Sequence, residues 1–179
     1  MLSKTLILGS ILAASVLARP AYSGEIIPDP CRRVLPQQLE EAIKRDHPGW
    51  EIVTLRHLPD WRQMEYEKQR ETSCPGVAKV NFYGDGRLAY ALSLIKQSGT
   101  ENAGLLLAQL DKSGRWTLTM LWEVGCACEP KTEPAGEYKD VYGEKTIRSK
   151  GEVIVLDLGS VARLFAWTGD KIDSIHIKD

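Results

Sequence analysis

The residues of this sequence with the most specific chemistry are four cysteines, Cys31, Cys74, Cys126 and Cys128. In an oxidising compartment, an even number of cysteines in a small chain predicts two disulfide bonds. A bond between Cys126 and Cys128 would close a very small, strained ring, so we expect each of them to bond outward to Cys31 or Cys74. The alternative is a labile Cys126–Cys128 bond with redox activity, because strain makes a disulfide easier to reduce.

Histidines and nucleophiles form no recognisable signature in this chain. His47, His57 and His176 are scattered and show none of the spacings that zinc sites use. No G-x-S-x-G motif and no cofactor motif occurs. Carboxylates are numerous, and a glycosidase needs only two of them at the right separation, which a sequence does not show. We therefore predict no catalytic residue, no metal and no cofactor, and keep a cell-wall or glycan hydrolase as an alternative.

The five tryptophans divide into two groups by their surroundings. Trp116 and Trp122 lie on one face of an alternating segment, which predicts core packing. Trp50 and Trp61 lie near helix ends among charged neighbours, and aromatic residues in such places anchor protein partners. We therefore take Trp50 and Trp61 as candidate partner-binding residues.

The elements that must position these residues follow an N-terminal leader. A basic residue near the start, an apolar run over residues 6–17 and the small-residue triplet Ala21-Tyr22-Ser23 predict a signal peptide over residues 1–23. A run of about a dozen residues is short of the roughly 20 that span a membrane. We expect cleavage before Gly24, a periplasmic or secreted protein, and no membrane span in the mature chain.

The mature chain over residues 24–179 is weakly acidic. Of the 23 basic residues, Lys4 and Arg19 belong to the leader, which leaves 21 against 24 acidic residues. A chain of this charge without a block of Lys or Arg lacks the electrostatic surface of a nucleic-acid or anionic-membrane binder. Its length suits a single domain, and the oligomeric state stays open.

Two helices are predicted in the N-terminal part. The first covers residues 35–47, with Leu39, Ala42 and Ile43 at helical spacing on the core side, and it ends at Pro48-Gly49.

The second predicted helix runs from Asp60, as its N-cap, to about Glu71. Its narrow apolar stripe consists of Trp61, Met64 and the stem of Lys68. A mobile polar excursion is the alternative for this segment.

From Val77 onward the apolar residues recur with the period of two that is typical of strands. Turns with glycine at positive φ are expected at residues 84–86, 112–114 and 168–170. Strands are expected at residues 51–55, 77–82, 88–94, 116–123, 153–158, 161–167 and 172–177. The predicted fold class is α+β, with one or two N-terminal helices packed on a twisted antiparallel β-meander of about six or seven strands.

The segment from Gly125 to Ser149 is rich in proline, glycine and charge and shows no clear periodicity. We expect an irregular excursion that Cys126 and Cys128 tether, and such long loops are more often functional than idle. The hypothesis is that it faces a partner; the alternative is that the disulfides serve stability alone. Its candidate partner-binding residues are Lys131, Glu133, Glu137 and Lys139.

The stretch from Asn81 to Ala91, with Gly84-Asp85-Gly86 at its centre, resembles the FG-GAP or VCBS-type loop, in which aspartates wrap calcium. Asn81, Tyr83, Asp85 and Ala89 stand at the ligand positions, so one carboxylate and one amide are present where calcium needs six to eight oxygens. The order of short motifs, from the first helix to residues 165–171, is similar to small exported bacterial proteins with one degenerate FG-GAP-like hairpin. The resemblance implies export and fold, and no reaction.

Taken together, these features favour an exported, disulfide-stabilised, non-enzymatic binding protein that docks a protein of the cell envelope, as inhibitors and immunity proteins do. Small sheets held by disulfide bonds are well suited to presenting loops to a protein partner. The alternatives are a hydrolase that uses a carboxylate pair and a structural component of the envelope.

Overall fold

The computed structural model describes residues 30–31, 34–69, 71–97, 102–125, 127–158 and 161–178. The predicted leader, its cleavage site before Gly24 and Cys126 lie outside the described residues. Within those ranges, no helix has the length and apolar character needed to cross a bilayer.

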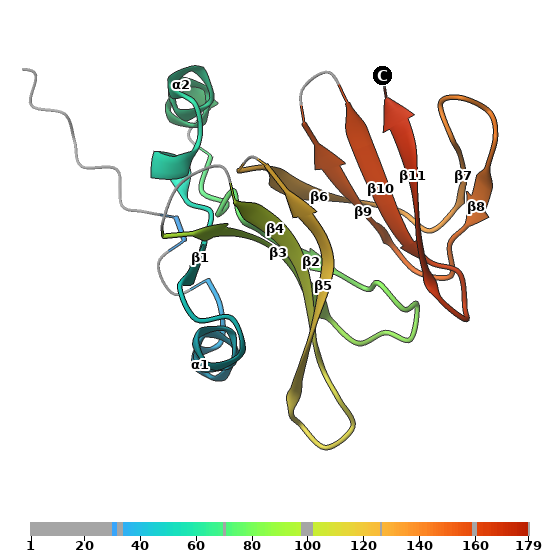
Figure 1. Cartoon of the computed structure of the whole chain (residues 1–179), viewed down its shortest axis with the longest axis horizontal. Helices are drawn as coiled ribbons and strands as arrows, with labels where there is room; N and C mark the ends of the chain where they lie inside the picture. The colour runs from blue at the N-terminus through green and yellow to red at the C-terminus, as the bar shows by residue number, and fades with distance from the viewer. Residues whose placement is uncertain are drawn as a thin grey trace, which may run out of the picture.

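The described chain folds into two α-helices, one 3₁₀ helix and eleven strands, and the strands form three antiparallel sheets (Figure 1). The α+β class is confirmed, whereas the prediction of a six- or seven-stranded meander is wrong. The elements are α1 (Gln37–Asp46), β1 (Trp50–Ile52), η1 (Leu55–His57), α2 (Asp60–Gln69), β2 (Val77–Val80), β3 (Ala89–Lys96), β4 (Ala103–Leu110), β5 (Trp116–Val124), β6 (Glu129–Glu133), β7 (Glu137–Lys139), β8 (Thr146–Arg148), β9 (Val153–Asp157), β10 (Ala162–Trp167) and β11 (Ile172–Lys178).

The first sheet is built around β3. Strands β1 and β2 both pair with one edge of β3, β1 with its C-terminal part and β2 with its N-terminal part. Strand β4 pairs with the other edge of β3, and β5 follows β4 at the border of the sheet. The eight residues of β3 therefore hold three strands in place.

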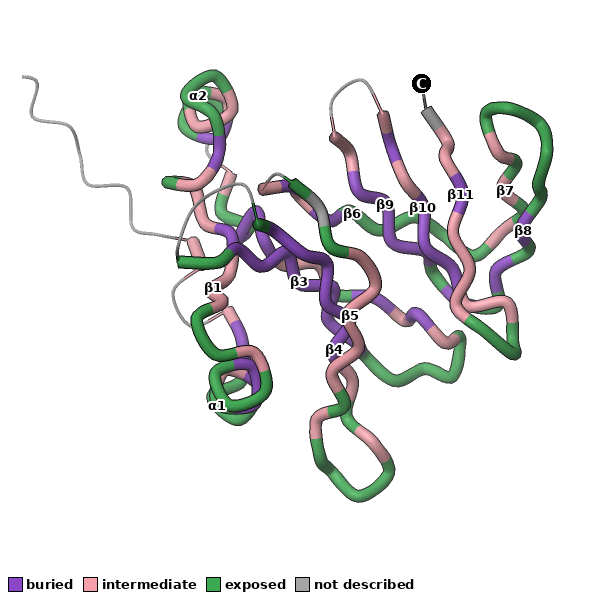
Figure 2. Tube along the Cα trace, viewed as in Figure 1, coloured by how far each residue is buried: buried purple, intermediate pink, exposed green. Residues whose placement is uncertain are grey.

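The second sheet has the order β11-β10-β9-β6, and β7 and β8 form a separate hairpin. The two sheets pack face to face, with side chains of β2, β3 and β4 against those of β9 and β10. Helix α1 covers the outer face of the first sheet, and the β7–β8 hairpin covers the outer face of the second. Figure 2 shows the result: the central strands are buried along most of their length, the helices are exposed on one side and buried on the other, and the turns are mostly exposed.

Strand β4 was missed from the sequence. Its first six residues, Ala103 to Ala108, are all buried, because one set of side chains faces α1 and the other faces the second sheet. Strands covered on both faces carry continuous apolar runs instead of an alternation. The period-two signal on which strand prediction rests is therefore absent there.

Strand β5 is predicted correctly as a strand, but its aromatic residues do not share one face. The register with β4 shifts so that Leu106 lies opposite Met120 and Leu105 lies opposite Trp122, which makes Leu121 an extra residue. Such a bulge moves every later side chain to the other face. Trp116 accordingly packs on the side of α1, and Trp122 packs between the sheets.

The prediction of an irregular excursion over residues 125–149 is wrong. Strand β6 pairs along its whole length with β9, and β7 pairs with β8. Ser149 closes the hairpin: its N–H donates to the Gly136 carbonyl (2.9 Å), and its hydroxyl accepts from the Gly136 N–H (2.8 Å). Only a few side chains here are buried, among them Pro130 and Ile147, so backbone pairing holds strands that show no apolar periodicity.

The predicted first helix is confirmed at residues 37–46, with Leu39, Ala42 and Ile43 buried. The second helix is also confirmed, but its expected apolar stripe is wrong. Trp61 and Met64 are exposed, and Tyr66 is the buried residue of α2.

The predicted glycine turns have the expected backbone, with positive φ at the glycines. Gly84 shows a second requirement, since a side chain there would meet the Lys150 carbonyl oxygen at 2.3 Å. A side chain at Gly151 would likewise meet the Asn81 carbonyl oxygen at 2.3 Å. Glycine therefore allows the loop after β2 to lie directly on the loop before β9, which locks the two sheets together.

Candidate functional site

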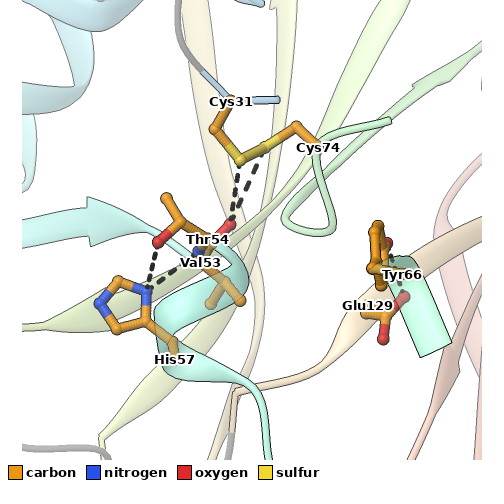
Figure 3. The surroundings of a disulfide bond; sticks show 7 residues. All are labelled: Cys31, Val53, Thr54, His57, Tyr66, Cys74 and Glu129. Atoms are coloured by element: carbon orange, nitrogen blue, oxygen red, sulfur yellow. Dashed lines mark hydrogen bonds between the residues drawn. A yellow bond between two sulfur atoms is a disulfide. The ribbon is translucent and has the colours of Figure 1, made fainter. Parts of the chain in front are cut away.

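A disulfide between Cys31 and Cys74 joins the segment before α1 to the loop before β2 (Figure 3). The Val53 carbonyl oxygen lies 3.7 Å from the Cys31 sulfur and 3.9 Å from the Cys74 sulfur. A disulfide sulfur carries no proton, so these are close sulfur–oxygen contacts. The bond encloses α1, β1, η1 and α2 in one covalent loop, with a sequence separation of 43.

This pairing corrects the expected one. Because Cys31 and Cys74 are bonded to each other, neither can bridge to Cys126 or Cys128. Cys128 lies in the core between the two sheets, and Cys126 is outside the described residues. The expectation rested on the strain of a Cys126–Cys128 ring, which gives no information on whether Cys31 and Cys74 meet. The fold brings these two residues together at the edge of the first sheet.

Helix α2 is attached to the rest of the molecule by a charged residue. Arg62 Nε donates to Glu129 Oε1 (2.6 Å), and a second guanidinium nitrogen donates to Glu129 Oε2 (2.8 Å). The same guanidinium also bonds Glu65 at 2.9 Å and lies 3.7 Å from Glu71. Both main partners are largely shielded, with 17 % and 16 % of the side chains of Arg62 and Glu129 exposed. A bidentate ion pair that is shielded from solvent holds α2 in place better than an exposed pair would.

Tyr66 completes this attachment. Its hydroxyl donates to Glu129 Oε2 (3.0 Å), and its ring lies 4.7 Å from the Arg62 guanidinium carbon (Figure 3 shows the tyrosine and the glutamate). Burial and the neighbouring Glu129 carboxylate raise the pKa of Tyr66, and the Glu129 hydrogen bond raises the pKa of Arg62. At neutral pH the cluster therefore consists of a charged arginine, a neutral tyrosine and a carboxylate engaged on both oxygens.

The outward side of α2 carries two large apolar residues one helical turn apart. Trp61 is 60 % exposed and Met64 is 61 % exposed. Trp61 also lines a cavity of about 500 Å³ between α2 and the start of β6. We call Trp61, Met64 and this cavity the α2 surface. Its other lining residues include Leu58, Pro59, Arg62, Glu65, Glu129, Lys131, Asp157 and Leu158.

Two of the partner-binding residues predicted from the sequence meet in this surface. Trp61 and Lys131 line the same cavity although 70 residues separate them in the chain. Trp50 does not join them: it is half-buried in the cluster under α1, with Lys96 Nζ 5.1 Å from its ring centroid. Trp50 therefore packs against the core of the first sheet and does not line the α2 surface.

The remaining predicted residues lie elsewhere. Glu133 is at the far end of β6, and Glu137 and Lys139 belong to β7, which Figure 1 shows at the opposite end of the molecule from α2. Glu137 is exposed and pairs with Arg148 at 2.7 Å. Exposed pairs of this kind contribute little energy. The structure therefore divides the predicted excursion between two distant surfaces.

The loop that resembles an FG-GAP turn is held together by its own side chains. Asn81 Oδ1 accepts from the Gly86 N–H (3.1 Å), and Asp85 accepts from the Arg87 side chain at 2.6 and 2.8 Å. The bonds from Arg87 hold the pKa of Asp85 below its ordinary value. A guanidinium thus neutralises the single carboxylate of the turn. Nowhere in the described ranges do three His, Cys, Asp or Glu side chains cluster as metal ligands.

One pattern was overlooked in the sequence: Ser93-Leu94-Ile95-Lys96 matches the S-x-x-K motif of serine acyl-transfer enzymes. That motif brings serine and lysine together only on a helix. Here it lies on β3, where residues three apart point to opposite faces. Ser93 is buried and Lys96 is exposed, so the two do not form a nucleophile and base.

The chain matches no protein-family model, no curated protein and no solved structure. What the arrangement can do is therefore argued from its own geometry. The α2 surface combines exposed apolar side chains with a cavity beside them, and the Arg62–Glu129 ion pair fixes the cavity wall. A site of this kind can receive a protruding side chain.

Proposed function

We propose that this chain is an exported, disulfide-stabilised, non-enzymatic binding protein that docks a protein of the cell envelope through the α2 surface. The observation that supports this proposal best is the exposure of Trp61 and Met64 beside a cavity of about 500 Å³. Large apolar side chains grouped on a surface mark interaction sites, and tryptophan is the residue most enriched among binding hot spots.

The construction of α2 supports the same proposal. A ten-residue helix that buries a single side chain gains little from packing. Besides the Tyr66 ring, which packs in a small buried cluster, α2 is held by the Arg62–Glu129 pair and by the disulfide loop. A surface fixed before binding loses less conformational entropy when the partner docks.

The residues that line the cavity indicate what kind of partner it would bind. Apolar residues such as Leu58, Pro59 and Leu158 line it together with three carboxylates and two basic side chains. Such a site receives an apolar side chain, and its slight excess of negative charge favours a basic residue next to that side chain. The expected ligand is therefore a protein surface that presents an apolar and a basic residue side by side.

The test compares capture by the protein and by two variants. The purified protein is immobilised and incubated with an envelope extract, and the affinity of each retained protein is then measured with purified components. Trp61→Ala/Met64→Ala should weaken binding by about 100-fold or more, because hot-spot truncations each cost about 2 kcal/mol. A matched control, Val141→Ser/Tyr142→Ser, removes two exposed apolar residues from the β7–β8 turn and should bind as the wild type does.

Three results would contradict the proposal. Equal affinity of the α2 variant and the wild type would move the binding face elsewhere, and the triple change Glu133→Ala/Glu137→Ala/Lys139→Ala would then test the β6–β8 region. Turnover of a glycan substrate without any captured partner would favour the hydrolase instead. A structural envelope role would show as neither capture nor turnover.

A further inference from the structure

Strand β5 forms a border of the first sheet, and nothing described in this structure pairs with its outer edge. The order of the sheet places β4 on one side of β5 and no strand on the other. Its nine residues make it the longest strand of the described chain. Unpaired edges of this length are templates for a further strand.

The alternation of the β4–β5 ladder identifies the backbone groups that face outward. The ladder begins at the turn, where the Asp111 N–H donates to the Arg115 carbonyl at 2.8 Å. Residues opposite each other in an antiparallel pair alternate between bonded and non-bonded positions. Thr117 and Thr119 therefore point their N–H and C=O groups toward β4, and Trp116, Leu118 and Met120 point theirs away from the sheet.

This edge lacks the usual protection against pairing. From Trp116 to Trp122 the strand contains no charge, no proline and no glycine, and Glu123 is its first charged residue. The bulge at Leu121 comes after the straight part of the strand. Natural edges are normally blocked by lysine, proline or a bulge within the exposed stretch.

The straight part of β5 is chemically symmetric about Leu118. Thr117 and Thr119 flank it on one face of the sheet, and Trp116 and Met120 lie two residues away on the other. A strand with this symmetry complements its own copy in the antiparallel direction, since a two-fold axis exchanges each residue with its equivalent.

We propose that β5 pairs antiparallel with β5 of a second copy of this chain, with the two-fold axis at Leu118. Leu118 then lies opposite Leu118 of the second copy, Thr117 opposite Thr119, and Trp116 opposite Met120. All outward N–H and C=O groups of Trp116, Leu118 and Met120 find partners, because these residues fall at the bonded positions of the new ladder.

The side-chain pairs that result are favourable ones. Threonine pairs stabilise adjacent strands, and a thioether beside an aromatic ring gains contact energy. Trp116, Leu118 and Met120 are half-buried under α1 at present, and the second copy would cover them further. The two first sheets become one continuous sheet with an α1 helix of each copy on the same face.

The test is the mass of the purified protein by sedimentation equilibrium over concentrations from about 1 µM to about 1 mM, the range of weak to moderate complexes. The wild type should approach twice the monomer mass. Thr117→Lys/Thr119→Lys places lysines opposite each other at both threonine pairs, and dimerisation should weaken by about tenfold. The matched control Thr117→Lys/Thr119→Glu has the same bulk with opposite charges facing each other, and it should remain a dimer.

Amide hydrogen exchange reports the pairing directly. Exchange at Trp116, Leu118 and Met120 should slow as the concentration rises, whereas Thr117 and Thr119 should be protected at every concentration by their bonds to β4. A wild type that stays monomeric throughout the range would overturn the proposal. So would lysine and lysine–glutamate variants of equal affinity, or a dimer in which the three outward amides exchange at the monomer rate.

Discussion

The two α-helices within the described ranges have the same length and lie in the same disulfide loop, yet they are held in different ways. Helix α1 buries Leu39, Ala42 and Ile43 on the first sheet. Helix α2 buries Tyr66 and leaves Trp61 and Met64 in solvent. The first is fixed by an apolar face removed from water, and the second by one buried ring, which packs on Val53, Leu58 and Ile95, and by a guanidinium with its carboxylates.

This difference separates a structural helix from a presented one. The apolar face of α1 is buried against the first sheet, so α1 exposes no large apolar side chain to a partner. The attachment of α2 uses Arg62 and Tyr66, and it therefore leaves Trp61 and Met64 exposed. Four changes to the protein test how far this distinction extends, and each reports the free energy of unfolding in urea.

Removal of the disulfide should have the largest effect. Cys31→Ser/Cys74→Ser opens a loop with a sequence separation of 43, and the entropy of closing such a loop corresponds to about 4 kcal/mol. Both helices lose their covalent restraint, but α2 should show the larger rise in amide exchange because it has less packing to hold it. Equal rises in the two helices would remove the proposed distinction.

Truncation within α1 should cost slightly less. Leu39 is completely buried, and Leu39→Ala should lower the free energy of unfolding by about 3 kcal/mol through lost burial and the cavity left behind. Gln38→Ala, on the exposed side of the same helix, serves as the control. Trp61→Ala in α2 should change stability by less than about 0.5 kcal/mol, as is usual at exposed positions. A large loss from Trp61→Ala would show that the tryptophan is a packing residue.

Breaking the ion pair tests the attachment of α2. Arg62→Met keeps the aliphatic stem but leaves Glu129 without its main partner, and it should cost about 2 kcal/mol. The double change Arg62→Met/Glu129→Gln removes the uncompensated charge and should recover part of this loss. If the single variant were as stable as the wild type, α2 would be held by contacts other than this pair.

The dependence of stability on alkaline pH tests the contribution of Tyr66. Its pKa is raised above the ordinary value of 10.0, mainly by burial. The unfolded chain ionises near that ordinary value, so the stabilising contribution is intact below about pH 10 and is lost as the pH rises toward the raised pKa. Between about pH 9.5 and pH 11, the wild type should lose about 1 kcal/mol more stability than Tyr66→Phe. Tyr83 and Tyr138, whose pKa values are also raised, are present in both proteins and cancel.

The parts of the fold that follow local rules were predictable from the sequence. Helix α1 has apolar residues at helical spacing and ends at Pro48-Gly49, and both features depend only on neighbouring residues. The alternating strands and the glycine turns were predictable for the same reason, because their signals also lie in neighbouring residues. Strand β4 was not predictable in this way, because burial on both faces removes the alternation.

The candidate site could be predicted only in part. Trp61 was identified because it lies near a helix end among charged neighbours, and the structure shows that it lines the same cavity as Lys131. The interaction that holds it in place joins residues 67 positions apart, and one sequence contains no signal for such a pair. The expected stripe on α2 was wrong for the same reason. Tyr66 faces inward, where its ring packs with Leu58 and its hydroxyl donates to Glu129, and both contacts depend on the fold.

The covalent loop between Cys31 and Cys74 also determines how the molecule would respond to tension. A force applied across both cysteines passes through the sulfur atoms and bypasses α1, β1 and α2. The 43 positions of that loop correspond to about 150 Å of extended chain that stretching cannot release. Pulled from its ends, the protein should therefore lengthen only through the chain outside residues 31–74, and its contour should grow by about 150 Å more once the bond is reduced.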